Sequence, residues 1–291
     1  MCCDKTHKDL KMREISTEKI TETISSLCIR ANHYLAPDMK NAFNDAVAKE
    51  RSELGKKILG QLEDNLKIAE EDMIPICQDT GMAVVFIKVG QEVHITGGSL
   101  EDAINEGVRK GYTEGFLRKS VVSDPIERKN TGDNTPAVIH YSIVPGDKIE
   151  ITVAPKGFGS ENMSRVFMLK PADGIEGVKN AVLTAVKDAG PNACPPMVVG
   201  VGIGGTFEKC ALLAKKALTR KAGSHSEIGW VKDLEEELLE KINKTGIGPG
   251  GLGGAVTAFA VNVLTYPTHI AGLPVAVNIC CHVNRHVSAV L

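Results

Sequence analysis

The chain has 291 residues, of which 43% are hydrophobic and 24% charged, so it can bury the core of one large domain or two smaller ones. Its formal net charge is -2, and this near-neutral balance argues against nucleic acid or an anionic membrane as a partner. No apolar run approaches the roughly 20 residues that span a bilayer. The N-terminal charges are not followed by an apolar core, so we expect neither a membrane span nor a secretory signal.

The cysteine content limits the compartment and the kind of site. Eight cysteines are too sparse, in a chain of this length, for a disulfide-stabilised scaffold. Without an export signal we expect a cytoplasmic protein in a reducing environment. Thiols there are free, buried or bound to metal.

The predicted fold is mixed α and β. Residues 1–72 are predicted to form a helical lobe, because apolar side chains recur at helical spacing over 20–28, 39–47 and 54–66. Residues 73–291 alternate predicted helices with short strands and are expected to form an α/β region.

The first part of this α/β region combines one strand, one helix and one hairpin. Residues 83–89 form a short apolar run that predicts a buried strand. The segment 99–102 resembles an N-cap box and predicts a helix to about residue 112. Residues 137–144 favour a strand, and apolar residues alternate over 149–153 after a Pro-Gly-Asp turn, so we predict a β-hairpin.

Later in the chain, we predict helices over 175–186, 207–221 and 231–244, and strands over 198–203 and 274–279. Two glycine-rich stretches lie among them. Residues 200–205 (GVGIGG) match only the bare spacing G-x-G-x-x-G, which is a weak signal alone, and residues 246–254 lack the Lys-Ser/Thr of a P-loop. We therefore do not expect a nucleotide site.

Three cysteine segments favour a site over a buried position. Cys77 lies in a polar Cys-Gln-Asp-Thr-Gly loop before a predicted strand. Cys194 precedes two prolines, which stiffen its loop. Cys280 and Cys281 follow a predicted strand and precede His282. Neighbouring strand side chains point in opposite directions, so only one of this pair should ligate, and periodicity does not say which.

Each segment also has a simpler interpretation, as a small buried thiol, a turn, or a helix end followed by prolines. Cys210 lies in a helical pattern and is predicted to be core, while Cys2 and Cys3 are weak candidates at the terminus. Three thiolates on separate loops can hold an iron–sulfur cluster with one iron open. Zinc stays an alternative, although the C-x₂₋₄-C pairs of structural zinc sites are missing from the sequence.

Several polar segments are suited to an anionic substrate. Asp79 could carry a proton, and Gln78 could hydrogen-bond a ligand. Arg118 follows a predicted helix end, and an arginine fork binds both oxygens of a carboxylate. Residues 128–136 are densely polar, and 156–162 contain glycines where a backbone can approach an anion. Any one of these basic residues alone is more often a solvated surface charge.

Together these segments resemble the α subunit, or N-terminal catalytic domain, of class I iron–sulfur fumarate hydratases and the related L-tartrate dehydratases. The resemblance extends from residue 75 to residue 282, most of the chain. The matching segments are PICQDTG (75–81), RKNT (128–131), DNTP (133–136), KGFGSEN (156–162), ACPP (193–196), GGLGG (250–254), THIA (268–271) and CH (281–282).

The resemblance implies a 4Fe–4S cluster ligated by Cys77, Cys194 and Cys281. It selects Cys281 over Cys280 because the family's ligand directly precedes a histidine. It also implies that the helical lobe and the α/β region together make one fumarase-type catalytic domain.

The same matching implies roles for residues around a substrate. Asp79 and His269 are implied in catalysis, with Asp79 as the base or as the activator of a partner threonine. Substrate contacts are implied for Gln78, Arg118, Gly159 and Asn162.

Single-chain members of this family continue into a second domain that supplies further substrate-binding residues, including a catalytic threonine. We therefore expect this chain to be the larger subunit of a two-subunit enzyme, inactive alone, with a β subunit carrying the second domain. We expect a dimer of heterodimers.

The implied activity is the reversible hydration of fumarate to (S)-malate by a hydro-lyase acting on a small dicarboxylate. An L-tartrate dehydratase α subunit is the first alternative, because these motifs do not separate the two substrates. A metal-binding regulatory subunit without catalysis is the second. It would explain the cysteines but not Asp79, Arg118 and the glycine-rich anion loops in one chain.

Overall fold

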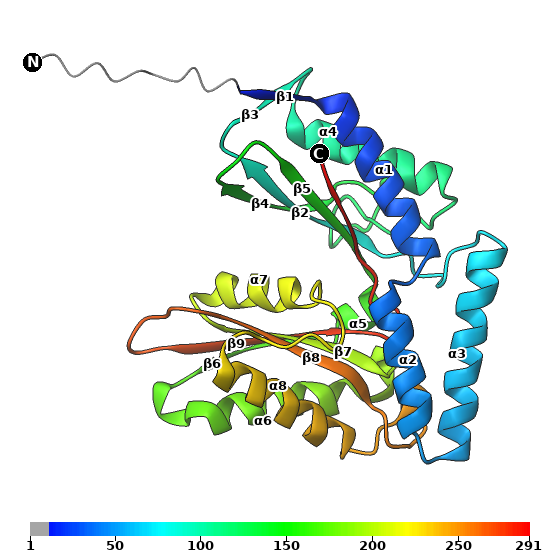
Figure 1. Ribbon diagram of the computed structural model, residues 1–291, viewed down its shortest axis with the longest axis vertical. Helices are drawn as coiled ribbons and strands as arrows, with labels where there is room; N and C mark the ends of the chain where they lie inside the picture. The colour runs from blue at the N-terminus through cyan, green and yellow to red at the C-terminus, as the bar shows by residue number, and fades with distance from the viewer. Residues whose placement is uncertain (1–11) are drawn as a thin grey trace, which may run out of the picture. The chain divides into compact units, whose positions relative to one another are not determined.

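A computed structural model describes residues 12–291, so Cys2 and Cys3 lie outside the described part of the chain. The chain forms two compact units (Figure 1), which confirms the mixed α and β class. One unit takes residues 12–32, 78–155 and 286–291, and the other takes His33–Cys77 and Lys156–Arg285. Each unit draws on residues from both sides of position 72, so the compact units cut across the two predicted regions.

The first unit packs two helices on a four-stranded sheet with the order β10-β5-β2-β4. The sheet strands are β2 (Met82–Gly90), β4 (Val138–Val144), β5 (Ile149–Lys156) and β10 (Val287–Val290). The helices are α1 (Thr17–His33) and α4 (Leu100–Glu114), and a parallel pair is formed by β1 (Arg13–Ser16) and β3 (Val93–Thr96). Ile24 of α1 and Val108 of α4 share one buried core with Val85 of the sheet.

The start of α4 is confirmed as an N-cap, because the Ser99 Oγ accepts a hydrogen bond from the Asp102 N–H at 3.3 Å. Inside α4, Gly107 permits a close approach of α1. A Cβ at that position would lie 2.8 Å from the carbonyl oxygen of Thr21. The backbone of α4 therefore touches α1 directly at Gly107. A larger residue there would push the two helices apart.

The predicted hairpin over 137–153 is wrong, although both of its strands exist. β4 pairs with β2 in parallel, and β5 lies on the other side of β2. The Gly90 N–H donates to the Lys148 carbonyl at 2.8 Å, and the Gln91 N–H donates to the Val144 carbonyl at 2.9 Å. The residues at the end of β2 thus bond to the carbonyls of Val144 and Lys148. In a hairpin, these carbonyls would instead be available for pairing β4 with β5.

The second unit is built on a sheet with the order β6-β9-β7-β8. Its strands are β6 (Arg165–Leu169), β7 (Met197–Gly204), β8 (Ala258–Tyr266) and β9 (Leu273–Cys280). β8 runs parallel to β7, whereas β9 runs antiparallel to it. One face carries α6 (Gly174–Ala189) and α8 (Gly229–Asn243), and the other carries α7 (Phe207–Ala217) (Figure 1).

The glycines of β7 serve helix packing. A Cβ on Gly200 would lie 2.2 Å from the Ala214 carbonyl oxygen, and one on Gly202 would lie 2.0 Å from the Cys210 carbonyl oxygen. α7 therefore rests directly on the strand backbone. This contact gives a structural reason for the glycines at 200 and 202.

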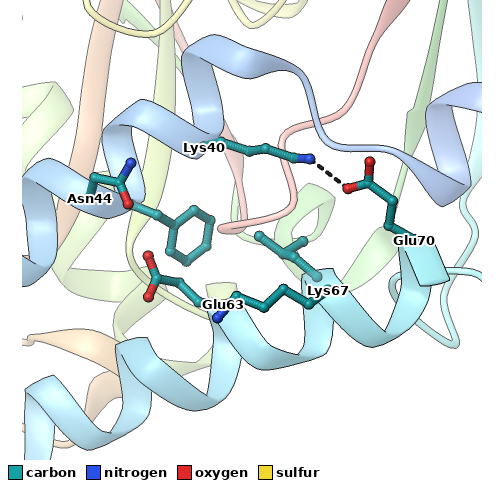
Figure 2. A pocket seen from close by; sticks show the side chains of 7 residues that line it. Lys40, Asn44, Glu63, Lys67 and Glu70 are labelled. Atoms are coloured by element: carbon teal, nitrogen blue, oxygen red, sulfur yellow. Dashed lines mark hydrogen bonds and ion pairs between the residues drawn. The ribbon is translucent and has the colours of Figure 1, made fainter.

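Two further helices of this unit, α2 (Pro37–Lys49) and α3 (Glu53–Glu71), confirm the helical pattern of the N-terminal region. Between them lies a cavity of about 370 Å³ with polar side chains at its rim (Figure 2). Lys40 and Glu70 form an ion pair across the rim at 2.6 Å. The buried ring of Phe43 lines the cavity and meets the His282 ring edge-on, with centroids 6.3 Å apart.

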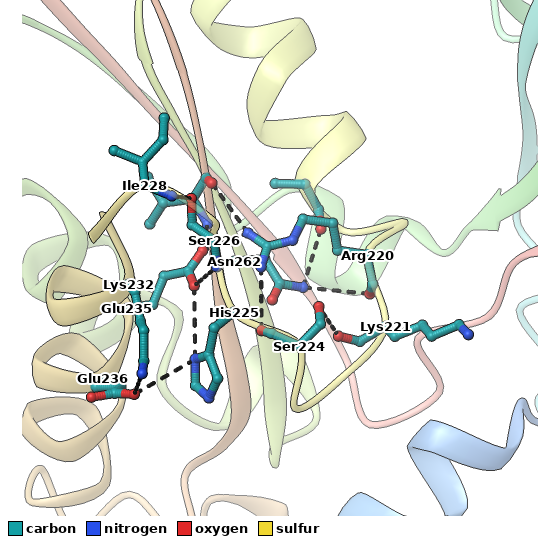
Figure 3. Close-up of polar contacts among 12 residues, drawn as sticks. Arg220, Lys221, Ser224, His225, Ser226, Ile228, Lys232, Glu235, Glu236 and Asn262 are labelled. Atoms are coloured by element: carbon teal, nitrogen blue, oxygen red, sulfur yellow. Dashed lines mark hydrogen bonds and ion pairs between the residues drawn. The ribbon is translucent and has the colours of Figure 1, made fainter. Parts of the chain in front are cut away.

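The helix predicted to run to Lys221 ends earlier, at Ala217. The Asn262 amide donates to the carbonyl of Ala217 at 3.1 Å and to that of Arg220 at 3.5 Å, replacing the next turn of helix. The Arg220 guanidinium turns away to the buried carboxylate of Glu235, as Figure 3 shows. A tertiary ion pair therefore overrides the helical pattern of residues 218–221.

The sequence analysis predicted no strand at β8, and it missed several short elements, namely β1, β3, β6, β10 and the one-turn helix α5 (Phe158–Glu161). Strands of four or five residues hold too few side chains to show a clear period. They exist because a neighbouring strand supplies their hydrogen bonds. Among the described residues, no helix combines the length and apolar character needed to cross a membrane.

Candidate active site

All three predicted cysteine ligands belong to the second unit. Each is a free thiol outside the helices and strands, with Cys194 exposed and Cys77 and Cys281 half-buried. The following contacts bring their segments together.

Cys194 sits in a tight turn between α6 and β7. α6 stops at Ala189, a 3₁₀ turn covers Gly190–Ala193, and Cys194 then adopts the left-handed region with φ 51° and ψ 65°. Its N–H donates to the Pro191 carbonyl at 3.0 Å. A left-handed backbone is uncommon for a residue with a Cβ, and such conformations concentrate at functional sites.

Cys281 is joined to this turn through the next residue. His282 donates to the Cys194 carbonyl oxygen from its backbone N–H at 3.2 Å and from its ring Nδ1 at 3.0 Å. Because a carbonyl only accepts, Nδ1 carries the proton. Burial lowers the pKa of His282, so its ring is favoured in the neutral form.

The structure separates the two adjacent cysteines that periodicity could not. Cys280 is buried, with 4% of its surface exposed, and belongs to the apolar core beside Val198. Cys281 is only half-buried. The exposure difference therefore favours Cys281 as the accessible thiol.

Cys77 lies in the connection between α3 and β2. The Asn65 amide donates to the Ile76 carbonyl at 2.9 Å and so fixes the backbone directly before the cysteine. The Ile76 side chain is buried in the same core cluster as Cys280. Burial raises the pKa of Cys194, and the nearby Cys77 thiolate raises it further, so these two thiols lie within electrostatic reach of each other.

Positive charge surrounds the Cys280–Cys281 pair. A hydrogen bond between the two thiols, joined by the charges of Lys156 and Arg285, lowers the pKa at which the pair first loses a proton. Thiolate is the metal-binding form of cysteine. This donor set therefore fits iron or another thiophilic metal.

Within residues 12–291, no three His, Cys, Asp or Glu side chains converge closely enough to hold a single metal ion. In a cubane cluster each thiolate binds its own iron. The three sulfurs of such a site therefore border a shared space and do not meet at one point.

A glycine-rich loop supports the Cys194 turn from outside. The Gly250 N–H donates to the Pro195 carbonyl at 2.9 Å. Gly251 lies against Pro191, and a Cβ there would come within 2.6 Å of the Pro191 Cα. The glycine at 251 is thus explained by its contact with the cysteine turn, and that at 250 by its left-handed backbone, with φ 62°.

Glu50 anchors this glycine-rich loop. Its buried carboxylate accepts the N–H groups of Ser52 at 2.9 Å, Ala255 at 2.9 Å and Val256 at 3.0 Å. Burial alone would raise the pKa of Glu50, but these backbone donors outweigh it and the pKa lies below its ordinary value. The sequence did not single out Glu50, because one acidic residue between two helices carries no motif.

Gly159 and Asn162 lie on a turn next to the cysteines. Both are exposed on or directly after α5, and a Cβ on Gly159 would lie 3.8 Å from the Asn192 carbonyl oxygen. Asn192 is two residues before Cys194. The structure therefore brings the predicted anion loop 156–162 to the cysteine turn.

A buried polar network fixes this turn, and sequence reasoning missed it. Glu161 forms ion pairs with Lys156 at 3.2 Å and with Lys215, and it accepts from the Asn278 amide at 2.9 Å. Burial would raise the pKa of Glu161, but Lys156 and Lys215 reverse the direction and lower it. Lys215 lies in a helix, and only the tertiary structure could reveal it as a partner.

Gln78, Asp79 and Arg118 belong to the first unit, which begins again one residue after Cys77. The Thr80 hydroxyl donates to the Arg118 carbonyl at 3.1 Å, so these predicted substrate residues share one neighbourhood. Asp79 is half-buried, and its Oδ1 accepts the Gly81 N–H at 3.0 Å. Gln78 and Arg118 are exposed.

Within the second unit, the structure does not bring His269 close to the three cysteines. His269 is exposed in the loop from β8 to β9, where its Nδ1 accepts the Ala271 N–H at 3.1 Å. The Thr268 hydroxyl donates to the Gly205 carbonyl at 2.9 Å, which fixes the loop at the far end of β7. Cys281 follows the opposite end of β9, about 26 Å away at 3.3 Å per strand residue.

Comparison with known proteins identifies the family of the chain. The fumarate hydratase (Fumerase) family model matches residues 21–290, so the chain belongs to this family of hydro-lyases. It is 45% identical over 273 residues to a putative L(+)-tartrate dehydratase subunit alpha of Methanocaldococcus jannaschii, covering 92% of this chain and 95% of the relative. It is 32% identical over 276 residues to the L(+)-tartrate dehydratase subunit alpha of Escherichia coli K12, covering 94% of this chain and 91% of the relative.

Proposed function

We propose that this chain is the α subunit of a 4Fe–4S-dependent hydro-lyase that adds water reversibly across the double bond of an unsaturated dicarboxylate. Hydration of fumarate to (S)-malate is the proposed reaction. The observation that supports it most strongly is the gathering of Cys77, Cys194 and Cys281 in one unit of a chain from this family.

The three thiolates would hold the cluster by three of its irons. The charges of Lys156 and Arg285 help to lower the pKa at which the Cys280–Cys281 pair first loses a proton. When bound, the cluster supplies a Lewis acid that polarises the substrate hydroxyl. The hydrogen bonds from His282 to Cys194 would hold two of the ligands in place without joining the chemistry.

The remaining steps belong to side chains of this protein. Arg118 would pair with a substrate carboxylate through its guanidinium fork. Gly159 would let the backbone approach an anion, while Asn162 and Gln78 would orient the substrate by hydrogen bonds. Asp79 would take the proton from carbon at its carboxylate, or activate a threonine of the partner subunit.

His269 stays a proposed catalytic residue, but its distance from the cysteines limits where it could act. Its loop and Cys281 lie at opposite ends of β9. Catalysis by His269 therefore requires it to reach a site on another chain of the assembly.

The named relatives are alpha subunits, which supports a β subunit as the partner that completes the substrate site. A dimer of such heterodimers is the proposed assembly. The cytoplasm is the proposed location, on the ground that the free thiols suit a reducing compartment.

L(+)-tartrate is the second candidate substrate. The names of the relatives favour it, since both relatives cited are described as tartrate dehydratase subunits. The residues that would distinguish the extra hydroxyl of tartrate would come from the β subunit.

The test is anaerobic co-expression with a β subunit, followed by measurement of iron, sulfide and turnover. We expect about four irons for each α chain, and turnover of malate or of L-tartrate measured in separate assays. Tartrate-only turnover would replace the fumarate assignment by the tartrate one. Iron without turnover of any hydroxy-dicarboxylate would contradict the hydro-lyase and favour a regulatory subunit.

A further inference from the structure

The strand β4 leaves one edge of the first unit's sheet open. On one side it pairs with β2 in parallel, from Val84↔Val138 to Gly90↔Val144, and it is the last strand of that sheet in the described chain. The Val144 carbonyl accepts from Gln91, which follows β2. Because backbone groups alternate along a strand, those of Ile139, Tyr141 and Ile143 face the open edge.

The open edge lacks the usual protection against pairing. Natural edge strands carry charges, prolines or bulges that prevent another strand from adding. β4 has the sequence VIHYSIV with no acidic or basic residue other than one histidine, and its register with β2 shows no bulge. Tyr141 is 46% exposed and Ile143 76% exposed, so apolar side chains continue to the edge.

The order of residues in β4 is nearly the same in both directions. Read from either end, valine, isoleucine and a polar residue lead to the central Tyr141. Antiparallel pairing of two β4 strands about Tyr141 would place Ile139 opposite Ile143 and Val138 opposite Val144. Such like-with-like apolar pairs stabilise sheets, and a two-fold interface requires a self-complementary surface.

We propose that β4 is the contact between two copies of this chain. The two strands pair antiparallel around Tyr141, and the two four-stranded sheets become one continuous sheet. The palindromic order selects a second copy as the occupant, because a strand from a different protein would not need symmetry in β4. This interface does not depend on the proposed activity, and it would supply one two-fold axis of the proposed assembly.

The register gives a sharp test with cysteine variants. In the proposed pairing, Tyr141 faces itself across the axis with Cα atoms about 5.5 Å apart, within the range for a disulfide. The variant Tyr141→Cys in the full chain, purified with its β subunit and oxidised mildly, should form a disulfide-linked α–α dimer that wild type does not form. Peptide mapping should locate the link at residue 141 in both chains.

Ile143→Cys is the matched control. Residue 143 faces residue 139 of the other copy, and its two copies would lie about 14 Å apart, too far to link. The double variant Ile139→Cys/Ile143→Cys should link again. Absence of a link at 141, or equal linking by Ile143→Cys alone, would overturn the proposed register.

A charge placed on the edge tests the interface itself. Ile143→Lys should reduce the number of α chains per particle from two to one in light scattering, because each lysine would place a charge against Ile139 of the other copy. Ile126→Lys, at a residue 86% exposed in a loop of the same unit, should leave the mass unchanged. An unchanged mass for Ile143→Lys would overturn the proposal, as would a cross-link that joins residue 141 to the β subunit.

Discussion

The two ends of the sheet in the second unit are built in different ways. At one end, Cys194 and Cys281 are held by His282, by the glycine-rich loop and, through that loop, by the buried carboxylate of Glu50. At the other end, His269 lies exposed in a loop fixed by a few local hydrogen bonds. Several independent hydrogen bonds therefore fix the cysteine end, as the proposed metal site would require, whereas the His269 loop is fixed by fewer contacts.

The largest effect should come from the cysteine end itself. Cys281→Ser should lose most bound iron and all turnover, because the half-buried thiol is the proposed ligand. Cys280→Ser should keep the iron and lose only stability, since its thiol lies in the apolar core. Iron and sulfide analysis of the two purified variants checks this prediction, and equal iron loss in both would contradict the assignment.

Glu50→Gln should have the next largest effect. The amide nitrogen cannot accept, so backbone N–H groups of the glycine-rich loop lose a partner at a cost of about 2 kcal/mol of unfolding free energy. Urea unfolding measures this loss, and the half-life of bound iron under a chelator should shorten.

Glu235→Gln is the matched control, because Glu235 is equally buried but binds Arg220 and the N–H of Val263 instead of the glycine-rich loop. It should lower stability and leave the iron half-life unchanged. Equal shortening in both variants would mean that Glu50 acts only on overall stability.

The Glu50 carboxylate should also make stability depend on pH, with a smaller effect than its substitution. The pKa of Glu50 is lower in the folded chain than its ordinary value of 4.5, so its contribution is fully present above that value. The contribution is lost as the pH falls through the folded pKa. The wild-type chain should therefore lose stability below about pH 5 more steeply than Glu50→Gln, and parallel urea midpoints for both proteins would contradict this.

The smallest effect on structure is expected at the opposite end of the sheet. His269→Gln should leave iron content and the urea midpoint unchanged, because the side chain is exposed and its ring accepts a hydrogen bond from Ala271 in its own loop. Turnover of the assembled enzyme should fall if His269 serves a site on another chain. A loss of iron in this variant would instead connect His269 to the cysteine end.

The sequence predicted the long elements well for a physical reason. α1 to α4, α6 and α8 each carry several apolar turns, and β2, β7 and β9 carry nearly continuous apolar runs, so their periods are clear. It also separated Cys77 and Cys194 from the core cysteine Cys210, because polar and proline residues surround Cys77 and Cys194.

Other features depended on contacts between distant residues. The pairing of β4 with β2, the early end of α7 at Asn262 and the Glu161 network are set by partners far away in the chain. No local period records such partners, so the pattern could predict the strands but not their order.

By itself, then, the sequence determined the mixed class, the long helices and strands, and the segments that carry the three cysteines. Only the tertiary structure decided that these segments meet in one unit, that Cys280 is buried while Cys281 is accessible, and that His269 lies at the far end of the sheet. The physical reason is that residue type and spacing fix local propensity and hydrophobic pattern. The direction in which a side chain points, and what it meets there, depends on packing against residues remote in the chain.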